Sequence, residues 1–275
     1  MTVTGSADDG VHANDAVLMA ARNAARIAKG GIMKSPQSMG MNRSGIDLAP
    51  QGAEEMRKAV QEFPPSSEGT EQNLVQFRGP YLAEADPIGS IPLPATVKGA
   101  AKSGMQKLMG RHAEVLIDKL GGRLAFERTG TRLYDALIGK FMSRKDEATM
   151  LSVDQLQQFR TEEAAHIGIC WDALRQLGAD PTCVTPLADT NAVASIGLMQ
   201  IIADPRMTVA QSLYAIHVAE LADNDGWQLL IKVARQMGQE EMAARFQTAL
   251  EEEDRHLASL RTWMEQICLN EAGVR

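Results

Sequence analysis

The sequence is poor in aromatic residues, which make up 4% of its 275 residues, whereas Ala, Leu and Met carry much of the apolar content. Sheet-based folds favour aromatic and β-branched side chains, so this composition favours helices over β-sandwiches. The sequence also lacks any run of about 18 consecutive apolar residues, the length that a membrane-spanning helix needs. We therefore expect an all-α protein that has no membrane partner.

Clusters of Lys and Arg are missing, and the formal net charge of −7 is unfavourable for binding a polyanion. A nucleic-acid partner is not expected, whereas an acidic chain suits a site that binds cations. Three cysteines, Cys170, Cys183 and Cys268, form no C-x-x-C pair, so neither a disulfide framework nor a zinc knuckle is indicated. Asp8 and Asp9 stand where a signal or transit peptide is basic, so we expect a cytoplasmic protein.

Helix-breaking residues are concentrated near the N-terminus, where residues 1–110 hold 13 of the 23 glycines and 8 of the 11 prolines. We expect residues 1–114 to form an irregular N-terminal extension. Short helices are predicted over Asn14–Lys29 and Ala53–Phe63, each followed by glycine or proline. The proline-rich stretch over residues 86–94 is expected to be extended.

From residue 115 onward, apolar residues recur three and four positions apart, which is typical of helices that pack one face inward. Four long helices are expected, the second opening on a capping box of Ser152 and Gln155: about Val115–Phe141, Ser152–Leu177, Thr208–Met237 and Gln239–Leu269. A connection of 30 residues, 178–207, separates the second helix from the third, with a short helix near Asn191–Ile202. This connectivity predicts an antiparallel four-helix bundle with one long crossover over residues 115–270.

Polar residues interrupt each of the four apolar faces near its middle. The first and third helices each carry one glutamate there, and the second and fourth each carry Glu-x-x-His: Glu127, Glu163 with His166, Glu220, and Glu253 with His256. Residues three apart share a helix face, so each Glu and His pair can reach one ion. The spacing from Glu127 to Glu163 is nearly that from Glu220 to Glu253, so the two hairpins can bring these side chains level.

Four buried carboxylates carry a charge of −4, which two divalent cations cancel. Glutamate and imidazole ligands suit iron or manganese. The set therefore predicts a dimetal centre, because without metal the same carboxylates would repel one another in a dry core.

In this ligand set, residues 115–268 resemble the ferritin-like superfamily, the carboxylate-bridged di-iron proteins that include ferritins, rubrerythrins and di-iron oxidases. The resemblance implies two Fe ions, or alternatively Mn/Fe, and an oxidoreductase that activates O2 or peroxide to oxidise a small molecule or Fe(II). It also leaves open ferroxidase-type iron handling or peroxide defence, and a possible homodimer. Tyr134, on the same face as Glu127, is a candidate redox or hydrogen-bonding residue.

Other interpretations of these residues remain open. Glu162, Glu252 and their acidic neighbours could make each cluster a solvated helix face, in which the spacing to histidine is incidental. His217 could add a ligand, and Asp223 and Asn224 could hydrogen-bond to one. Tyr134 could also be ordinary core, as could Cys170 and the tryptophans. A metal-free helical scaffold is the alternative from a different functional class.

Overall fold

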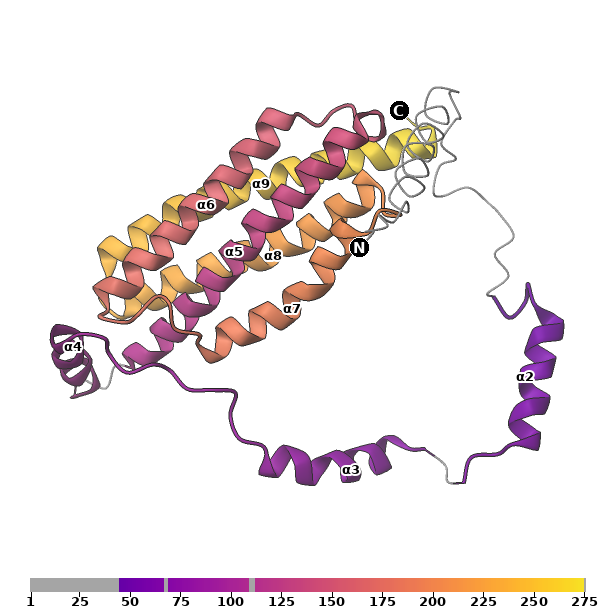
Figure 1. The fold of residues 1–275 in the computed structure, drawn as a ribbon, viewed down its shortest axis with the longest axis horizontal. Helices are drawn as coiled ribbons and strands as arrows, with labels where there is room; N and C mark the ends of the chain where they lie inside the picture. The colour runs from indigo at the N-terminus through magenta and orange to yellow at the C-terminus, as the bar shows by residue number, and fades with distance from the viewer. Residues whose placement is uncertain (1–44, 67–68, 109–111, 275) are drawn as a thin grey trace, which may run out of the picture. The chain divides into compact units, whose positions relative to one another are not determined.

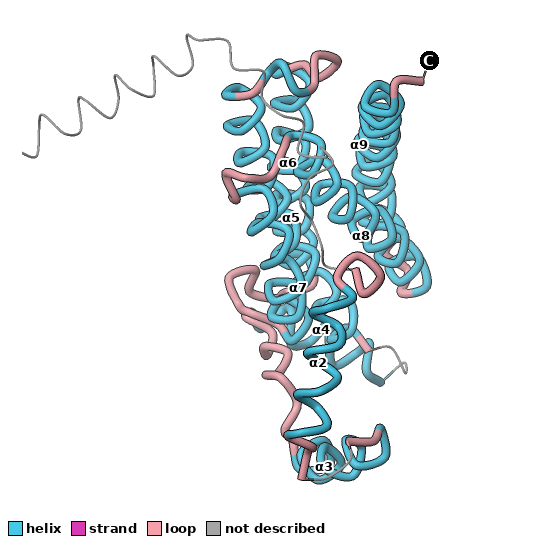
Figure 2. The backbone as a smooth tube through the Cα atoms, turned by 90° about the vertical axis from the view of Figure 1, so that its right-hand side faces the viewer, coloured by secondary structure: helices cyan, strands magenta, loops and turns pink. Residues whose placement is uncertain are grey.

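The computed structural model describes residues 45–66, 69–108 and 112–274, and the regular structure in these ranges is entirely helical (Figure 1). The elements are α2 (Pro50–Glu62), α3 (Glu71–Glu84), α4 (Val97–Leu108), α5 (Ala113–Ser143), the 3₁₀ turn η1 (Lys145–Glu147), α6 (Val153–Gln176), α7 (Pro186–Ala203), α8 (Val209–Gln236) and α9 (Glu240–Ala272). Figure 2 likewise shows helices and loops, with no strand, over the described residues. The all-α prediction is thus confirmed for these ranges. None of their helices combines the length and apolar character that crossing a bilayer requires.

The N-terminal part of the described chain contains more helix than the sequence indicated. The helix predicted over Ala53–Phe63 is present as α2, which begins at Pro50, where proline's missing N–H costs nothing. The predicted helix Asn14–Lys29 lies outside the described residues. Contacts between residues divide the chain into two units, with the boundary between Leu74 and Val75. The domain boundary expected after residue 114 stays a prediction.

Two helices, α3 and α4, were not predicted. Pro80 lies inside α3, where it removes one backbone hydrogen bond, and this is why the pattern did not indicate a helix. The segment before α4 is held by a hydrogen bond of 2.7 Å from the Ala95 N–H to the Gly178 carbonyl. Gly99 of α4 lies so close to Gly178 that a Cβ on either residue would collide with the other. Residues 86–94 contain neither helix nor strand, as expected.

The five later helices begin and end within five residues of the positions predicted from the sequence. Their caps differ from the prediction in one respect. Ser152 precedes α6 but its side chain makes no capping hydrogen bond, so the predicted capping box with Gln155 is wrong. A capping box does open α8, where Thr208 and Gln211 bond reciprocally to each other's backbone N–H groups.

Helices α5 to α9 pack alongside one another, with α5 against α6, α7 and α8, and with α9 against α8 and α6 (Figure 1). Their buried apolar side chains form two clusters. One includes Leu124, Cys170 and Trp227, and the other includes Leu133, Phe159 and Leu260. On α6, α8 and α9, buried polar residues stand between the stretches that supply these two clusters, and on α5 Glu127 lies close to the point where the two stretches meet. The core is therefore interrupted at mid-length by a polar layer.

Candidate metal centre

The polar layer contains all six side chains that the sequence singled out as ligands. Glu127 comes from α5, Glu220 from α8, and the two Glu-x-x-His pairs come from α6 and α9. None of the six residues is more than 2% exposed. They are called here the carboxylate–histidine cluster: Glu127, Glu163, His166, Glu220, Glu253 and His256.

Potential ligand atoms of the cluster gather into two main groups, within each of which all the atoms lie within 4.8 Å of one another. The Glu127 group consists of Glu127, His166 and Glu253. The Glu220 group consists of Glu163, Glu220, Glu253 and His256. Glu253 belongs to both groups, so its two oxygens can face two adjacent ions. Both groups contain the residue types that bind iron and manganese.

The histidine of each Glu-x-x-His motif lies close to the glutamate of the motif on the other helix. Nδ1 of His166 on α6 lies 2.8 Å from Oε1 of Glu253 on α9 and 3.5 Å from Oε2 of Glu127. Nδ1 of His256 on α9 lies 3.7 Å from Oε1 of Glu163 on α6 and 3.6 Å from Oε2 of Glu220. The glutamate of each motif thus approaches the histidine of the other, as a carboxylate that bridges two ions would.

The inward-facing atoms of this cluster lack hydrogen-bond partners. Both oxygens of Glu127 and of Glu253 are buried without one, as are Oε2 of Glu163 and of Glu220 and Nδ1 of both histidines. Buried polar groups are nearly always satisfied, because an unpaired one costs about 1–3 kcal/mol. These unpaired atoms converge on one space, and a cation there would satisfy them.

The Nε2 atom of each histidine contacts a second glutamate on the opposite helix. This second glutamate directly precedes the cluster glutamate in the sequence. Nε2 of His166 lies 2.8 Å from Oε2 of Glu252 on α9. Nε2 of His256 lies 2.7 Å from Oε2 of Glu162 on α6. A proton held on Nε2 leaves the lone pair of Nδ1 free to face the cluster, which is how a metal-ligating imidazole is oriented.

Burial and mutual repulsion shift the pKa values of the cluster. Burial raises the pKa of Glu220 to about 8, and the charge of Glu253 adds to the rise. The pKa of Glu163 is likewise raised by burial and by the nearby carboxylates. Burial lowers the pKa of His166, but contacts with Glu127 and Glu253 outweigh it and raise the pKa to about 11. Without metal, protons therefore hold the place of cations.

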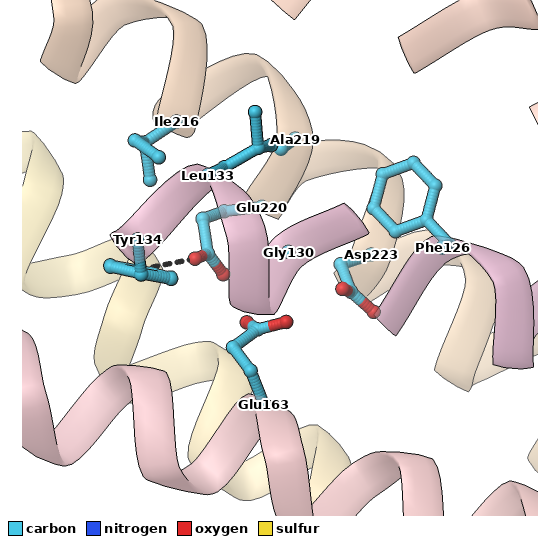
Figure 3. A pocket seen from close by; sticks show the side chains of 9 residues that line it. All are labelled: Phe126, Gly130, Leu133, Tyr134, Glu163, Ile216, Ala219, Glu220 and Asp223. Atoms are coloured by element: carbon cyan, nitrogen blue, oxygen red, sulfur yellow. Dashed lines mark hydrogen bonds between the residues drawn. The ribbon is translucent and has the colours of Figure 1, made fainter. Parts of the chain in front are cut away.

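A small cavity of about 10 Å³ adjoins the cluster between α5, α6 and α8. The side chains of Tyr134, Glu163 and Glu220 border it, and the Tyr134 hydroxyl donates a hydrogen bond to Oε1 of Glu220 (Figure 3). Its volume suits one water-sized molecule. Burial and the charge of Glu220 raise the pKa of Tyr134, so its hydroxyl keeps its proton at neutral pH. Gly130 provides room for the Glu163 carboxylate, which would collide with a Cβ there.

A buried ion pair stands beside the cluster. Arg123 of α5 donates to the Asp223 backbone oxygen at 3.0 Å and also to the Asp223 carboxylate of α8. The same guanidinium nitrogen lies 3.6 Å from Oε1 of Glu127. Asp223 itself offers an oxygen within 4.8 Å of ligand atoms of Glu127, Glu163 and Glu253.

The sequence left open the roles of four further residues: His217, Asp223, Asn224 and Cys170. Asp223 lies beside the cluster, whereas Asn224 bonds to Asp254 and Gln228. His217 is part of no ligand group among the described residues. Cys170 is buried in the apolar core, and burial raises the pKa of its thiol.

Sequence reasoning missed Arg123, and it treated Glu162 and Glu252 only as possible surface charges. The one available signal was that an acidic residue precedes the glutamate in both Glu-x-x-His motifs.

No family model matches the sequence, and no curated protein or solved structure gives a match to this chain.

Proposed function

We propose that residues 115–270 form a ferritin-like four-helix bundle whose carboxylate–histidine cluster binds two metal ions, two Fe or alternatively Mn and Fe. The observation that carries the proposal is the pair of ligand groups that share Glu253, with their inward atoms lacking partners. Four glutamates balance two divalent ions in charge. Glu127 and Glu220 would be terminal or bridging carboxylates, and Glu253, which belongs to both groups, would be shared by the two ions. This assignment uses the four helices that the sequence predicted.

The proposed activity is oxidation by O2 or peroxide, for which two reduced metal ions would supply the electrons. The protein contributes the surroundings. The two apolar clusters on either side of the polar layer exclude bulk water. Tyr134 donates its only hydroxyl proton to Glu220 at the edge of the cavity and so orients that carboxylate.

The size of this cavity favours a small reactant over an organic one. At about 10 Å³ it accommodates one water-sized molecule and has no room for an organic substrate. Ferroxidase or peroxide-defence chemistry, in which Fe(II) itself is oxidised, is therefore the second candidate function. The two are distinguished by adding Fe(II) in excess under O2. A ferroxidase continues to oxidise Fe(II) beyond two ions per chain, whereas an oxidase of organic substrates stops there.

The metal assignment is tested by loading the purified protein with Fe(II) without oxygen and measuring the bound metal per chain. We expect two ions, and an increase in near-ultraviolet absorption when O2 is admitted. His256→Ala should lose metal and O2-dependent oxidation, because the Glu220 group loses its nitrogen ligand. His217→Ala is the matched control, since His217 also lies on the cluster-bearing helices but in neither ligand group. Two ions retained in His256→Ala would refute the assignment.

The metal-free scaffold predicts a different result. In that case wild-type protein binds no metal at micromolar concentrations, and a chelator leaves its melting temperature unchanged.

A further inference from the structure

The two ligand groups are unequal in charge, because the Glu220 group has three carboxylates and the Glu127 group has two, and Arg123 adds a positive charge beside the Glu127 group. Arg123 is only 5% exposed, and a nitrogen of its guanidinium lies 3.6 Å from Oε1 of Glu127. The only basic groups within 4 Å of Glu163 or Glu220, among the described residues, belong to His256, itself a candidate ligand. A permanent cation therefore adjoins one of the two candidate ion positions and not the other.

The position of Arg123 is fixed from several sides. It donates twice to Asp223, and its guanidinium carbon lies 4.7 Å from the centre of the Phe126 ring. A glycine at position 226 of α8 makes room for it, since a Cβ there would come within 2.7 Å of a guanidinium nitrogen. These contacts hold the planar guanidinium of Arg123 in one orientation, so it stays beside Glu127 when an ion binds.

A fixed guanidinium acts on an incoming ion in two ways. It repels a divalent cation at the Glu127 group, in a buried setting where screening by solvent is weak. It also pairs with Asp223. The Asp223 carboxylate would otherwise be available to bind an ion together with Glu127, Glu163 and Glu253. Because Arg123 lies within 4 Å of Glu127 and not of Glu163 or Glu220, the repulsion weakens the Glu127 group relative to the Glu220 group.

We infer that Arg123, held by Asp223, makes the two metal positions bind in sequence, with the Glu220 group filled first and the Glu127 group filled second and more weakly. Arg123 is a positioning residue, since it touches Glu127 and does not itself ligate. The inference rests on the proposed dimetal site. Such inequality lets one position hold its ion firmly while the other exchanges it, which is what a centre that takes up Fe(II) as a substrate requires.

The test is calorimetric titration of the metal-free protein with Mn(II), which is stable in air. Wild type should bind two ions in separate steps, the second at least about ten-fold weaker than the first. Arg123→Gln should strengthen the second step by roughly ten-fold or more, because the repulsion disappears and Asp223 becomes free. Asp223→Asn should weaken the same step, because Arg123 then pairs with Glu127 alone. Tyr134→Phe is the matched control, since Tyr134 contacts Glu220 and should alter only the first step.

The outcomes separate this inference from the proposed function. If wild type binds no Mn(II) and no Fe(II), the dimetal proposal itself fails. If two ions bind with equal affinity, or if both variants shift the second step in one direction, only the role of Arg123 is refuted. Should Arg123→Gln not fold by circular dichroism, Asp223→Asn decides the matter, and an unchanged second step in that variant overturns the inference.

Discussion

The glutamate that precedes each cluster glutamate serves the opposite helix. Glu162 of α6 holds His256 of α9, and Glu252 of α9 holds His166 of α6. The relation is reciprocal, so the two Glu-Glu-x-x-His segments orient each other's imidazoles. A substitution of the preceding glutamate in one segment should therefore change the affinity for the ion that the histidine of the other segment binds.

This relation predicts a crossed effect on metal binding. Glu252→Ala should weaken the step assigned to His166, and Glu162→Ala the step assigned to His256, each by about 10–100-fold, because the imidazole loses the partner that fixes its orientation. Titration with Mn(II) measures both steps. Glu251→Ala is the control, because Glu251 is exposed and adjoins Glu252 on the same helix. Equal losses in the control and in Glu252→Ala would contradict the assigned role.

The six candidate ligands could be predicted from the sequence because their spacing follows from the helix itself. A polar residue on an otherwise apolar face is visible as a break in a pattern with a period of 3.6 residues. The partners Glu162, Glu252 and Arg123 could not be identified in this way. Their roles depend on which helices face each other, and an acidic residue next to a buried position is most simply an exposed one.

At the scale of the helix, α5 provides space for a neighbouring side chain as well as the candidate ligand Glu127. Gly130 stands opposite the Glu163 carboxylate, one turn beyond Glu127, and leaves no room for a Cβ. Gly139, nine residues further along α5, has no atom within 4 Å of the place where its Cβ would be. The two glycines therefore have different reasons for being in a helix, where glycine is unfavourable by about 0.5–1 kcal/mol relative to alanine.

Alanine substitutions at these two glycines should have opposite effects. Gly130→Ala should displace the Glu163 carboxylate, reduce bound metal below two ions per chain, and destabilise the fold by about 1–3 kcal/mol through overpacking. Gly139→Ala should leave metal content unchanged and stabilise the helix by up to about 1 kcal/mol. Metal analysis and urea unfolding measure the two effects. Normal metal content in Gly130→Ala would show that Glu163 can be accommodated elsewhere.

The later helices could be predicted and the earlier ones could not, for a physical reason. Long helices such as α8 bury one face against neighbouring helices. Apolar residues therefore recur every three or four positions in their sequences. In α3 no residue is buried, and Pro80 interrupts the pattern, so nothing in the sequence distinguished this segment from an extended one. Local capping signals were less reliable still, since Ser152 makes no capping bond although its sequence context suits one.

At the scale of the whole molecule, the polar layer divides the core into two apolar halves, and its charge links folding to pH. In metal-free protein the pKa of Glu220 is raised from 4.5 to about 8, and that of His166 from 6.5 to about 11. Both groups bind protons more tightly in the folded state than in the unfolded state. Each contribution to stability is complete below the unfolded pKa and is lost as pH rises through the folded one.

The stability of the protein should therefore depend on pH in opposite directions with and without metal. Between pH 5 and pH 8 the metal-free protein should melt at progressively lower temperature, because the unfolded state has released the Glu220 proton above its pKa of 4.5 whereas the folded state holds it up to about pH 8. With saturating Mn(II) the melting temperature should instead rise over this range, because ions bind only to deprotonated ligands and fewer protons compete for them. Melting curves at fixed ionic strength, with chelator or with Mn(II), measure the two slopes. Glu220→Gln should flatten the metal-free slope, since the amide neither binds nor releases a proton, while still accepting the hydrogen bond from Tyr134. Parallel slopes in the presence and absence of Mn(II) would mean that ions do not bind where these protons are held.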